Sequence, residues 1–152
     1  MSQASFALVI GLSQGVPKRA RSRIGLFLLG IWGVGVLIAM IFPIDVEGAP
    51  QTISGTVHGI NGRVAFLSLT AGAILVSRRF GQDEMWRPFH STALILSLVM
   101  LAAFIATFLN IATGSGFAGR CQRIFFAAFV TWFFLTATRL RSFATRSVPA
   151  PI

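Results

Sequence analysis

Residues 24–42 decide how this chain folds, and they read IGLFLLGIWGVGVLIAMIF. The stretch is 19 residues long and has no charged side chain. An α-helix rises about 1.5 Å per residue and the hydrocarbon core of a bilayer is about 30 Å thick, so roughly 20 apolar residues make one crossing. A basic cluster precedes the stretch and Pro43 follows it, which defines both ends of the helix. The sequence therefore predicts a transmembrane helix over residues 24–42.

The rest of the chain repeats this pattern of apolar blocks separated by polar connections. Three further blocks are long enough to cross a bilayer, at about residues 58–77, 91–113 and 121–140. The apolar stretch at about 6–16 is shorter and is predicted to be the end of a helix whose beginning is missing or lies at the interface. We expect an all-α polytopic transmembrane helix bundle, a single domain over residues 1–140, followed by a disordered cytoplasmic tail at 141–152.

The composition excludes an ordinary water-facing surface. Apolar residues make up 55% of the chain and charged residues 11%, whereas a soluble domain carries roughly 25% charged residues. The net charge is +9, but the cations lie between apolar blocks, as they do in membrane proteins near anionic headgroups. Membrane lipids, and not nucleic acid, are therefore the expected partners. The single cysteine, Cys121, excludes an intrachain disulfide.

The distribution of basic residues predicts the orientation of the bundle. Ten basic residues fall on one side of the predicted spans, and only Arg63, Arg120 and Arg123 fall on the other. Cytoplasmic connections of membrane proteins carry the excess of Lys and Arg. We therefore expect a multi-pass protein of the inner membrane with its C-terminus in the cytoplasm.

Small and aromatic residues in the spans are interpreted as packing elements. Gly35 and Ala39 form a pair that lets helices approach closely, and the other glycines of residues 24–42 favour the same role. Such glycine-lined faces serve packing within one subunit or formation of a homo- or hetero-oligomer. The aromatic residues around the last span are expected to face lipid, and Trp86 is expected to anchor the chain at the interface.

Polar side chains concentrate at the outer interface. We hypothesise a ligand-binding pocket there, in which Asp45 pairs with Arg63 or Arg123 while His58 titrates beside them. A lipid headgroup, a small anion or a proton-coupled ligand would suit such a pocket. The alternative is that these residues are interfacial cations and a helix-end histidine that hold the loop.

Metal and cofactor sites are not predicted. His58 and the other histidine, His90, fall at opposite ends of the predicted spans, so one chain does not place both on a single haem. One histidine with the loop acids Asp45 and Glu47 falls short of a metal-binding spacing. No motif for a nucleophile or a phosphate loop is present, so no catalytic residue is assigned.

Two segments resemble a known family. Phe42-Pro43-Ile44-Asp45 is followed after a short loop by Thr56-Val57-His58-Gly59, and Gly119-Arg120-Cys121-Gln122-Arg123 leads into the last apolar block. Over about residues 13–140 the chain is similar to the bacterial membrane family named domain of unknown function 998. The resemblance implies an additional N-terminal helix and outer loop that this sequence lacks. It carries four residues forward as motif positions: Asp45, His58, Gln122 and Arg123. It implies no reaction.

These observations favour a non-enzymatic membrane scaffold, sensor or small-ligand or lipid-binding protein. The hypothetical binding residues are Asp45, His58, Arg63, Gln122 and Arg123. A small-solute or proton-coupled transporter is one alternative, although the spans carry few charges near their middle. An intramembrane enzyme with His58 as general base, or a redox subunit, is the other.

Overall fold

The computed structural model describes residues 2–46, 48–114 and 116–146, and this part of the chain is helical. Five α-helices and one 3-10 turn follow one another along the chain. They are α1 (Ser2–Gly15), η1 (Lys18–Ala20), α2 (Arg23–Ile41), α3 (Ile53–Phe80), α4 (Arg87–Thr113) and α5 (Ala118–Arg146).

Four of these helices are long and apolar enough to cross a membrane. They cover Arg23–Ile41, Ile53–Phe80, Arg87–Thr113 and Ala118–Phe143. The predicted all-α bundle with four full spans is therefore confirmed. Helix α1 has 14 residues and reaches about 21 Å, which is shorter than the hydrocarbon core. The last three helices extend beyond the predicted apolar blocks, because intrahelical hydrogen bonds continue into polar segments at the interface.

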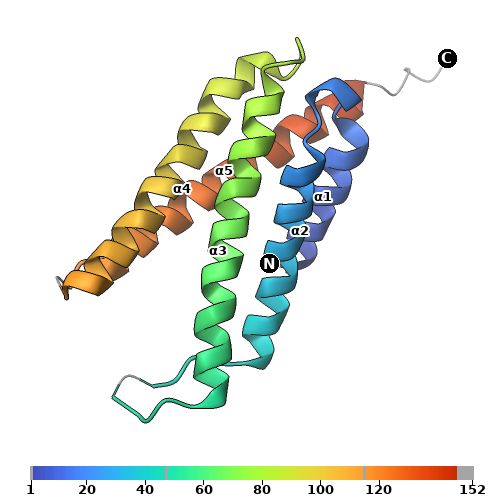
Figure 1. The fold of residues 1–152 in the computed structure, drawn as a ribbon. Helices are drawn as coiled ribbons and strands as arrows, with labels where there is room; N and C mark the ends of the chain where they lie inside the picture. The colour runs from blue at the N-terminus through green and yellow to red at the C-terminus, as the bar shows by residue number, and fades with distance from the viewer. Residues whose placement is uncertain (1, 47, 115, 147–152) are drawn as a thin grey trace.

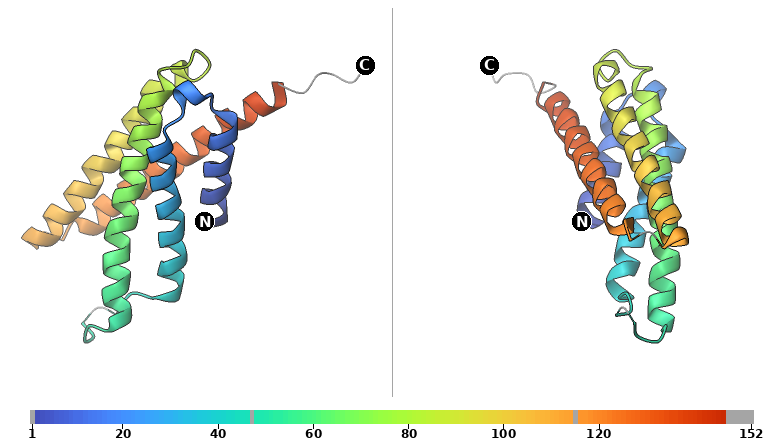
Figure 2. Two further views of the ribbon diagram at one scale, coloured as in Figure 1. Left: turned by 45° about the vertical axis from the view of Figure 1, so that its right-hand side comes forward. Right: turned by 90° about the vertical axis from the view of Figure 1, so that its left-hand side faces the viewer.

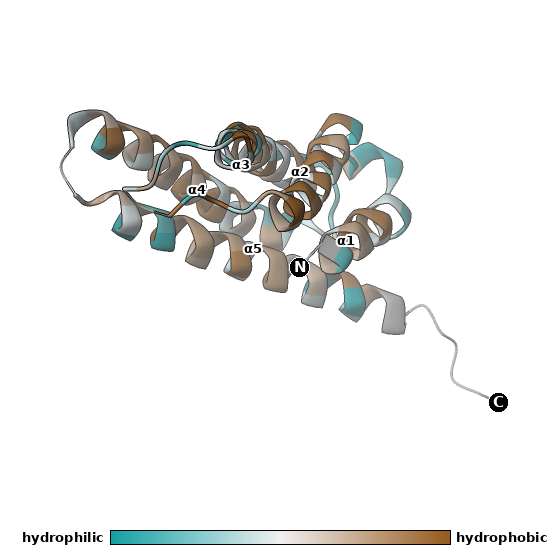
Figure 3. Ribbon diagram, turned by 90° about the horizontal axis from the view of Figure 1, so that it is seen from below, coloured by the Kyte–Doolittle hydropathy of each residue, from teal (hydrophilic) through white to brown (hydrophobic). Residues whose placement is uncertain are grey.

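The helices form two layers. Viewed from below, α4, α3, α2 and α1 follow one another in an arc, and α5 crosses beneath them (Figure 3). The side views show α5 running obliquely from the end of α4 towards α1 (Figures 1 and 2). Rings of α5 pack on three of the other helices: Phe129 lies 5.3 Å from Trp32 of α2, and Phe125 lies 5.0 Å from Phe66 of α3 and 6.4 Å from Phe104 of α4.

Local chemistry defines where the helices begin and end. The side chains of Ser22 and Thr52 accept hydrogen bonds from the backbone N–H groups of Gly25 and Gly55, which caps the first turns of α2 and α3. Pro88 stands in the first turn of α4, where its missing N–H is not needed. Gly114 ends α4 with a φ of 66°, a left-handed conformation that glycine adopts without strain.

Glycines allow α2 to approach its neighbours closely. A Cβ on Gly25 would lie 3.1 Å from the carbonyl oxygen of Gly72, and one on Gly35 would lie 2.7 Å from the Cβ of Ala65. Gly33 contacts the ring of Phe6 in α1, whereas the space beside Gly30 is open. Gly25, Gly33 and Gly35 therefore contribute to packing within the chain.

The centre of the bundle contains a polar contact among three helices. The indole nitrogen Nε1 of Trp132 donates to the Ser77 hydroxyl at 2.9 Å, and this hydroxyl lies 3.1 Å from the hydroxyl of Ser97. All three residues are fully buried. A buried polar group without a partner is costly in an apolar medium. This contact therefore fixes how α3, α4 and α5 pack together.

Three expectations about the C-terminal half need correction. Helix α5 continues to Arg146, so residues 141–146 are helical, and residues 147–152 of the expected tail lie outside the described residues. Trp86 is not an interface anchor: it is 1% exposed and stacks on Phe80 with 4.4 Å between ring centroids. Phe125, Phe129 and Trp132 of α5 are buried rather than lipid-facing, because α5 packs across the other helices.

Candidate functional site

A cavity of about 340 Å³ lies between α3, α4 and α5, at the end of the bundle that carries the α2–α3 loop. Three of the predicted binding residues line it: His58 and Arg63 from α3 and Gln122 from α5. We call this hollow the α3–α4 cavity. The structure thus brings together polar groups that are distant in the sequence.

His58 has a defined orientation at the mouth of the α3–α4 cavity. Its Nδ1 lies 2.8 Å from the carbonyl oxygen of Phe42, at the end of α2. A carbonyl oxygen only accepts hydrogen bonds, so Nδ1 carries the proton in this contact. The neutral imidazole then presents Nε2 as an acceptor, and the imidazolium presents it as a donor.

Arg63 lies at the start of the apolar part of α3, and its side chain is exposed on the bundle. At 1.5 Å per residue it is about 22 Å along the helix axis from Arg78, which marks the opposite end. The hydrocarbon core is about 30 Å thick, so Arg63 and Arg78 lie closer together along the helix axis than the two faces of this core. A cation within the core is costly unless it faces a polar cavity or a counter-charge. Among the residues that line the cavity, Arg63 is therefore the one that most needs an anionic or polar partner.

The deep wall of the α3–α4 cavity is aromatic. Phe66, Phe104 and Phe125 line it, and the ring of Phe125 meets that of Phe66 edge-on at 5.0 Å. Gln122 adds an amide with both donor and acceptor atoms at the cavity wall. The cavity therefore combines a polar mouth with an apolar interior, the arrangement that suits an amphipathic molecule.

The predicted pairing of Asp45 with an arginine is wrong. The carboxylate of Asp45 accepts hydrogen bonds from the backbone N–H of Thr52 at 2.9 Å and from its hydroxyl at 2.5 Å. These bonds lower the pKa of Asp45, the hydroxyl contributing most, against a smaller opposing effect of burial. The donors of Thr52 lie seven residues away in the same loop, so Asp45 bonds to them without fixing the long side chain of an arginine. Asp45 therefore closes the α2–α3 loop onto the capped start of α3.

One other residue of the predicted site, Arg123, is not part of the cavity lining. It is exposed, and within the described ranges no ion pair joins it to Asp45. Glu47 lies outside the described residues. The neighbouring Gln122 is on the wall instead, because adjacent helical positions point in directions about 100° apart.

The two histidines are far apart, as predicted. His90 Nδ1 lies 2.8 Å from the carbonyl oxygen of Ser77. Ser77 is near the other end of α3, about 28 Å along the axis from His58. Within the part of the chain that the structure describes, no three His, Cys, Asp or Glu residues gather where they could hold a metal ion.

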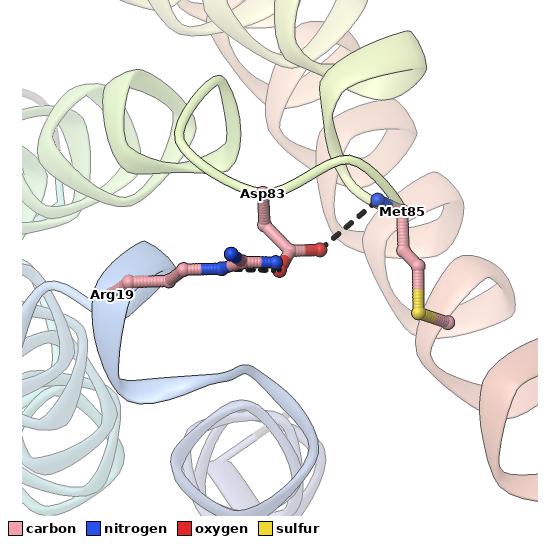
Figure 4. Close-up of polar contacts among 3 residues, drawn as sticks. All are labelled: Arg19, Asp83 and Met85. Carbon is pink, nitrogen blue, oxygen red and sulfur yellow. Dashed lines mark hydrogen bonds and ion pairs between the residues drawn. The ribbon is translucent and has the colours of Figure 1, made fainter.

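An ion pair at the opposite end of the bundle was not predicted from the sequence. Both Nε and Nη2 of Arg19 donate to Oδ2 of Asp83, at 3.0 and 2.9 Å, while Oδ1 accepts from the N–H of Met85 (Figure 4). Burial raises the pKa of Asp83, but the bonds and charge of Arg19 and the backbone N–H groups outweigh it, so the net shift is downward. The available signal was a pair of adjacent acids, Asp83 and Glu84, with arginines on both sides in the sequence.

The four spans and the mostly apolar helices define the class: this is a multi-pass α-helical membrane protein. The family model described as "Protein of unknown function (DUF998)" matches residues 2–139. The chain therefore belongs to the DUF998 family, which confirms the resemblance, and the match includes α1. Comparisons with characterised protein sequences and with solved structures gave no match.

Proposed function

We propose that this protein is a non-enzymatic membrane protein that binds an amphipathic anion in the α3–α4 cavity. The ligand would be a lipid or a lipid-like molecule with a carboxylate or phosphate headgroup. The observation that carries the proposal is Arg63, a cation at the start of the apolar part of α3 that lines a cavity with an aromatic interior.

The chemistry of the lining supports an anionic headgroup. Arginine presents a planar set of N–H donors that matches carboxylate and phosphate oxygens. His58 and Gln122 also line this cavity, and none of the lining residues is acidic. The apolar part of the ligand would lie against Phe66, Phe104 and Phe125. Asp45 supports this site indirectly, because it holds the loop that contributes Ile44 to the lining.

Native mass spectrometry of the detergent-purified protein tests the proposal. We expect the wild type to retain a defined adduct, and His58→Ala and Arg63→Ala to lose most of it. One charge-assisted hydrogen bond contributes about 1.5–3 kcal/mol, so Arg63→Ala should reduce occupancy about tenfold or more at limiting ligand.

Arg123→Ala is the matched control, because it removes an exposed arginine near the same end of the bundle but outside the cavity lining. It should retain the adduct. Equal loss in Arg123→Ala and Arg63→Ala would contradict the assignment of the cavity, as would a wild type that carries only non-specific lipid. Far-UV circular dichroism of each variant checks that it remains folded.

The orientation is a further part of this proposal. The excess of basic residues supports an inner-membrane protein of a bacterium with the α3–α4 turn and the C-terminus in the cytoplasm. The α2–α3 loop, with the mouth of the cavity, would then face outwards.

Cysteine labelling tests this orientation. In a Cys121→Ser background, we expect Ala49→Cys in the α2–α3 loop to react with a membrane-impermeant maleimide on cells whose outer membrane is permeabilised. Gln82→Cys in the α3–α4 turn should react only after the inner membrane is lysed. Both positions are exposed, so the reverse pattern of labelling would invert the proposed orientation.

A further inference from the structure

A second hollow, which we call the basic groove, lies at the opposite end of the bundle from the α3–α4 cavity. It has a volume of about 790 Å³. Its two sides come from the start of α2 with the preceding turn and from the end of α3. Five cations line it: Lys18, Arg21, Arg23, Arg78 and Arg79.

These cations have no acidic partner among the residues that the structure describes, where the one ion pair is that of Arg19 with Asp83. Two of them donate hydrogen bonds to neutral groups: Arg79 donates to the side-chain oxygen of Gln82 at 2.6 Å, and Arg21 donates to the carbonyl oxygen of Ser13. Like charges gathered around one hollow repel each other. The orientation bias of membrane proteins explains the side on which the cations lie, but not their convergence on one groove. An anion in the groove would relieve this repulsion.

The Arg19–Asp83 ion pair holds the two sides of the groove in place. Arg19 belongs to η1 and lies between Lys18 and Arg21 in the sequence. Asp83 lies in the α3–α4 turn, a few residues after Arg79 of α3. Asp83 is 2% exposed and also accepts the N–H of Met85, so its position is fixed (Figure 4). The single acid that pairs at this end therefore orders the groove without occupying it.

The groove continues into an apolar surface. Ile24 and Leu75 belong to its lining, and Ile24 is 67% exposed on the part of α2 that enters the membrane. Gly25, which follows Ile24, and Gly72, three residues before Leu75, bring the backbones of α2 and α3 close together. A ligand that fills the groove would thus meet cations at its head and apolar side chains beside its tail.

We infer that the basic groove binds the phosphate headgroup of an anionic phospholipid. Lys18, Arg23, Arg78 and Arg79 are exposed and would contact the phosphate oxygens, and Arg21 is half-buried beside them. Ile24 and Leu75 would contact the first part of an acyl chain. This site is separate from the α3–α4 cavity and does not depend on the function proposed there.

The test is lipid binding to the detergent-purified full chain, measured by native mass spectrometry. The probes are dioleoylphosphatidylglycerol, dioleoylphosphatidylcholine and inorganic phosphate. We expect the wild type to bind phosphatidylglycerol at least about tenfold more tightly than phosphatidylcholine, the value of one charge-assisted hydrogen bond. Arg78→Gln/Arg79→Gln should abolish this preference when it is combined with Arg63→Ala, which removes the cation of the α3–α4 cavity.

The control variant is Arg87→Gln/Arg120→Gln, which removes the same charge from exposed positions outside the groove. It should bind phosphatidylglycerol like the wild type. Equal weakening in both double variants would show a general surface attraction and overturn the site. Competition by inorganic phosphate as strong as that by phosphatidylglycerol would overturn the assignment to a lipid.

A third variant separates this inference from the proposed function. Arg63→Ala removes the cation of the α3–α4 cavity, and the phosphatidylglycerol preference that this variant retains is expected to be that of the basic groove. Complete loss of the preference in Arg63→Ala, with no loss in Arg78→Gln/Arg79→Gln, would place the lipid in the α3–α4 cavity and refute the basic groove.

Discussion

Replacing Gly72 with alanine is expected to separate α2 from α3 and to destabilise the bundle by about 1–3 kcal/mol, the usual cost of overpacking a close contact. The new Cβ would lie 2.9 Å from the carbonyl oxygen of Gly25, 3.1 Å from Cγ of Leu29 and 3.2 Å from Cβ of Leu28. The nearest of these atoms belongs to the backbone, so rotation of a side chain does not remove the clash. The free energy of unfolding, measured by titration with sodium dodecyl sulfate in mixed micelles, checks this result.

Gly30→Ala is the matched control for Gly72→Ala. Gly30 is also a helical glycine, and the space within 4 Å of its added Cβ is open. Alanine there should leave stability unchanged or raise it by up to about 1 kcal/mol, because glycine weakens a helix. If both variants were equally stable, the backbone contact of α2 with α3 would not be a determinant of the fold.

Loss of the Asp83 carboxylate is the second large effect that we expect. Asp83→Asn removes the charged acceptor for Arg19 and weakens the bond from the N–H of Met85, which together should cost about 1.5–3 kcal/mol. Arg19 remains 66% exposed in its side chain, so its charge is still hydrated after the substitution. The same titration in mixed micelles measures this loss.

The Asp83 variant also changes how stability depends on pH. The folded state holds the pKa of Asp83 below its ordinary value of 3.8. The stabilisation is therefore complete above pH 3.8 and is lost as the pH falls through the lower folded value. We expect the wild type to lose its advantage over Asp83→Asn below about pH 4. Asp45, whose pKa is also lowered, contributes to the pH dependence that both proteins share.

Glu84→Gln is the control for this experiment. Glu84 is the neighbouring acid, it is exposed, and among the described residues it forms no ion pair. Its removal should change neither the stability at neutral pH nor its decline in acid. A wild type and an Asp83→Asn variant with parallel stability curves from pH 7 to pH 3 would refute a role for the ion pair.

The sequence alone determined the fold class and most of the spans. Residues 24–42 are more uniformly apolar than a helix of a soluble protein. In lipid, the backbone N–H and C=O groups of such a segment form their hydrogen bonds within the helix itself. Length and charge therefore predict where the chain crosses, without knowledge of the neighbours of each helix. The family resemblance followed from Asp45, His58 and the segment before the last span, and the match to residues 2–139 confirmed it.

The candidate site was predicted only in part, because depth along a helix is readable from sequence but direction around it is not. His58, Arg63 and Gln122 line one cavity because α3 and α5 both border it. Arg123 follows Gln122 directly and yet is not part of that wall. Asp45 was assigned to an arginine by charge, whereas the fold of its own loop offered two closer donors in Thr52.

The sequence by itself determined that this chain is a membrane bundle. A lipid bilayer requires spanning segments that are apolar and long enough to cross it, and both properties are visible in the sequence. Only the tertiary structure decided which side chains meet. It buried Trp86, paired Arg19 with Asp83 across the helix connections, and gathered the remaining cations of two distant segments around one groove. The physical reason is that such contacts depend on the rotation and crossing of helices, which are fixed by glycine contacts and buried polar bonds between segments far apart in the chain.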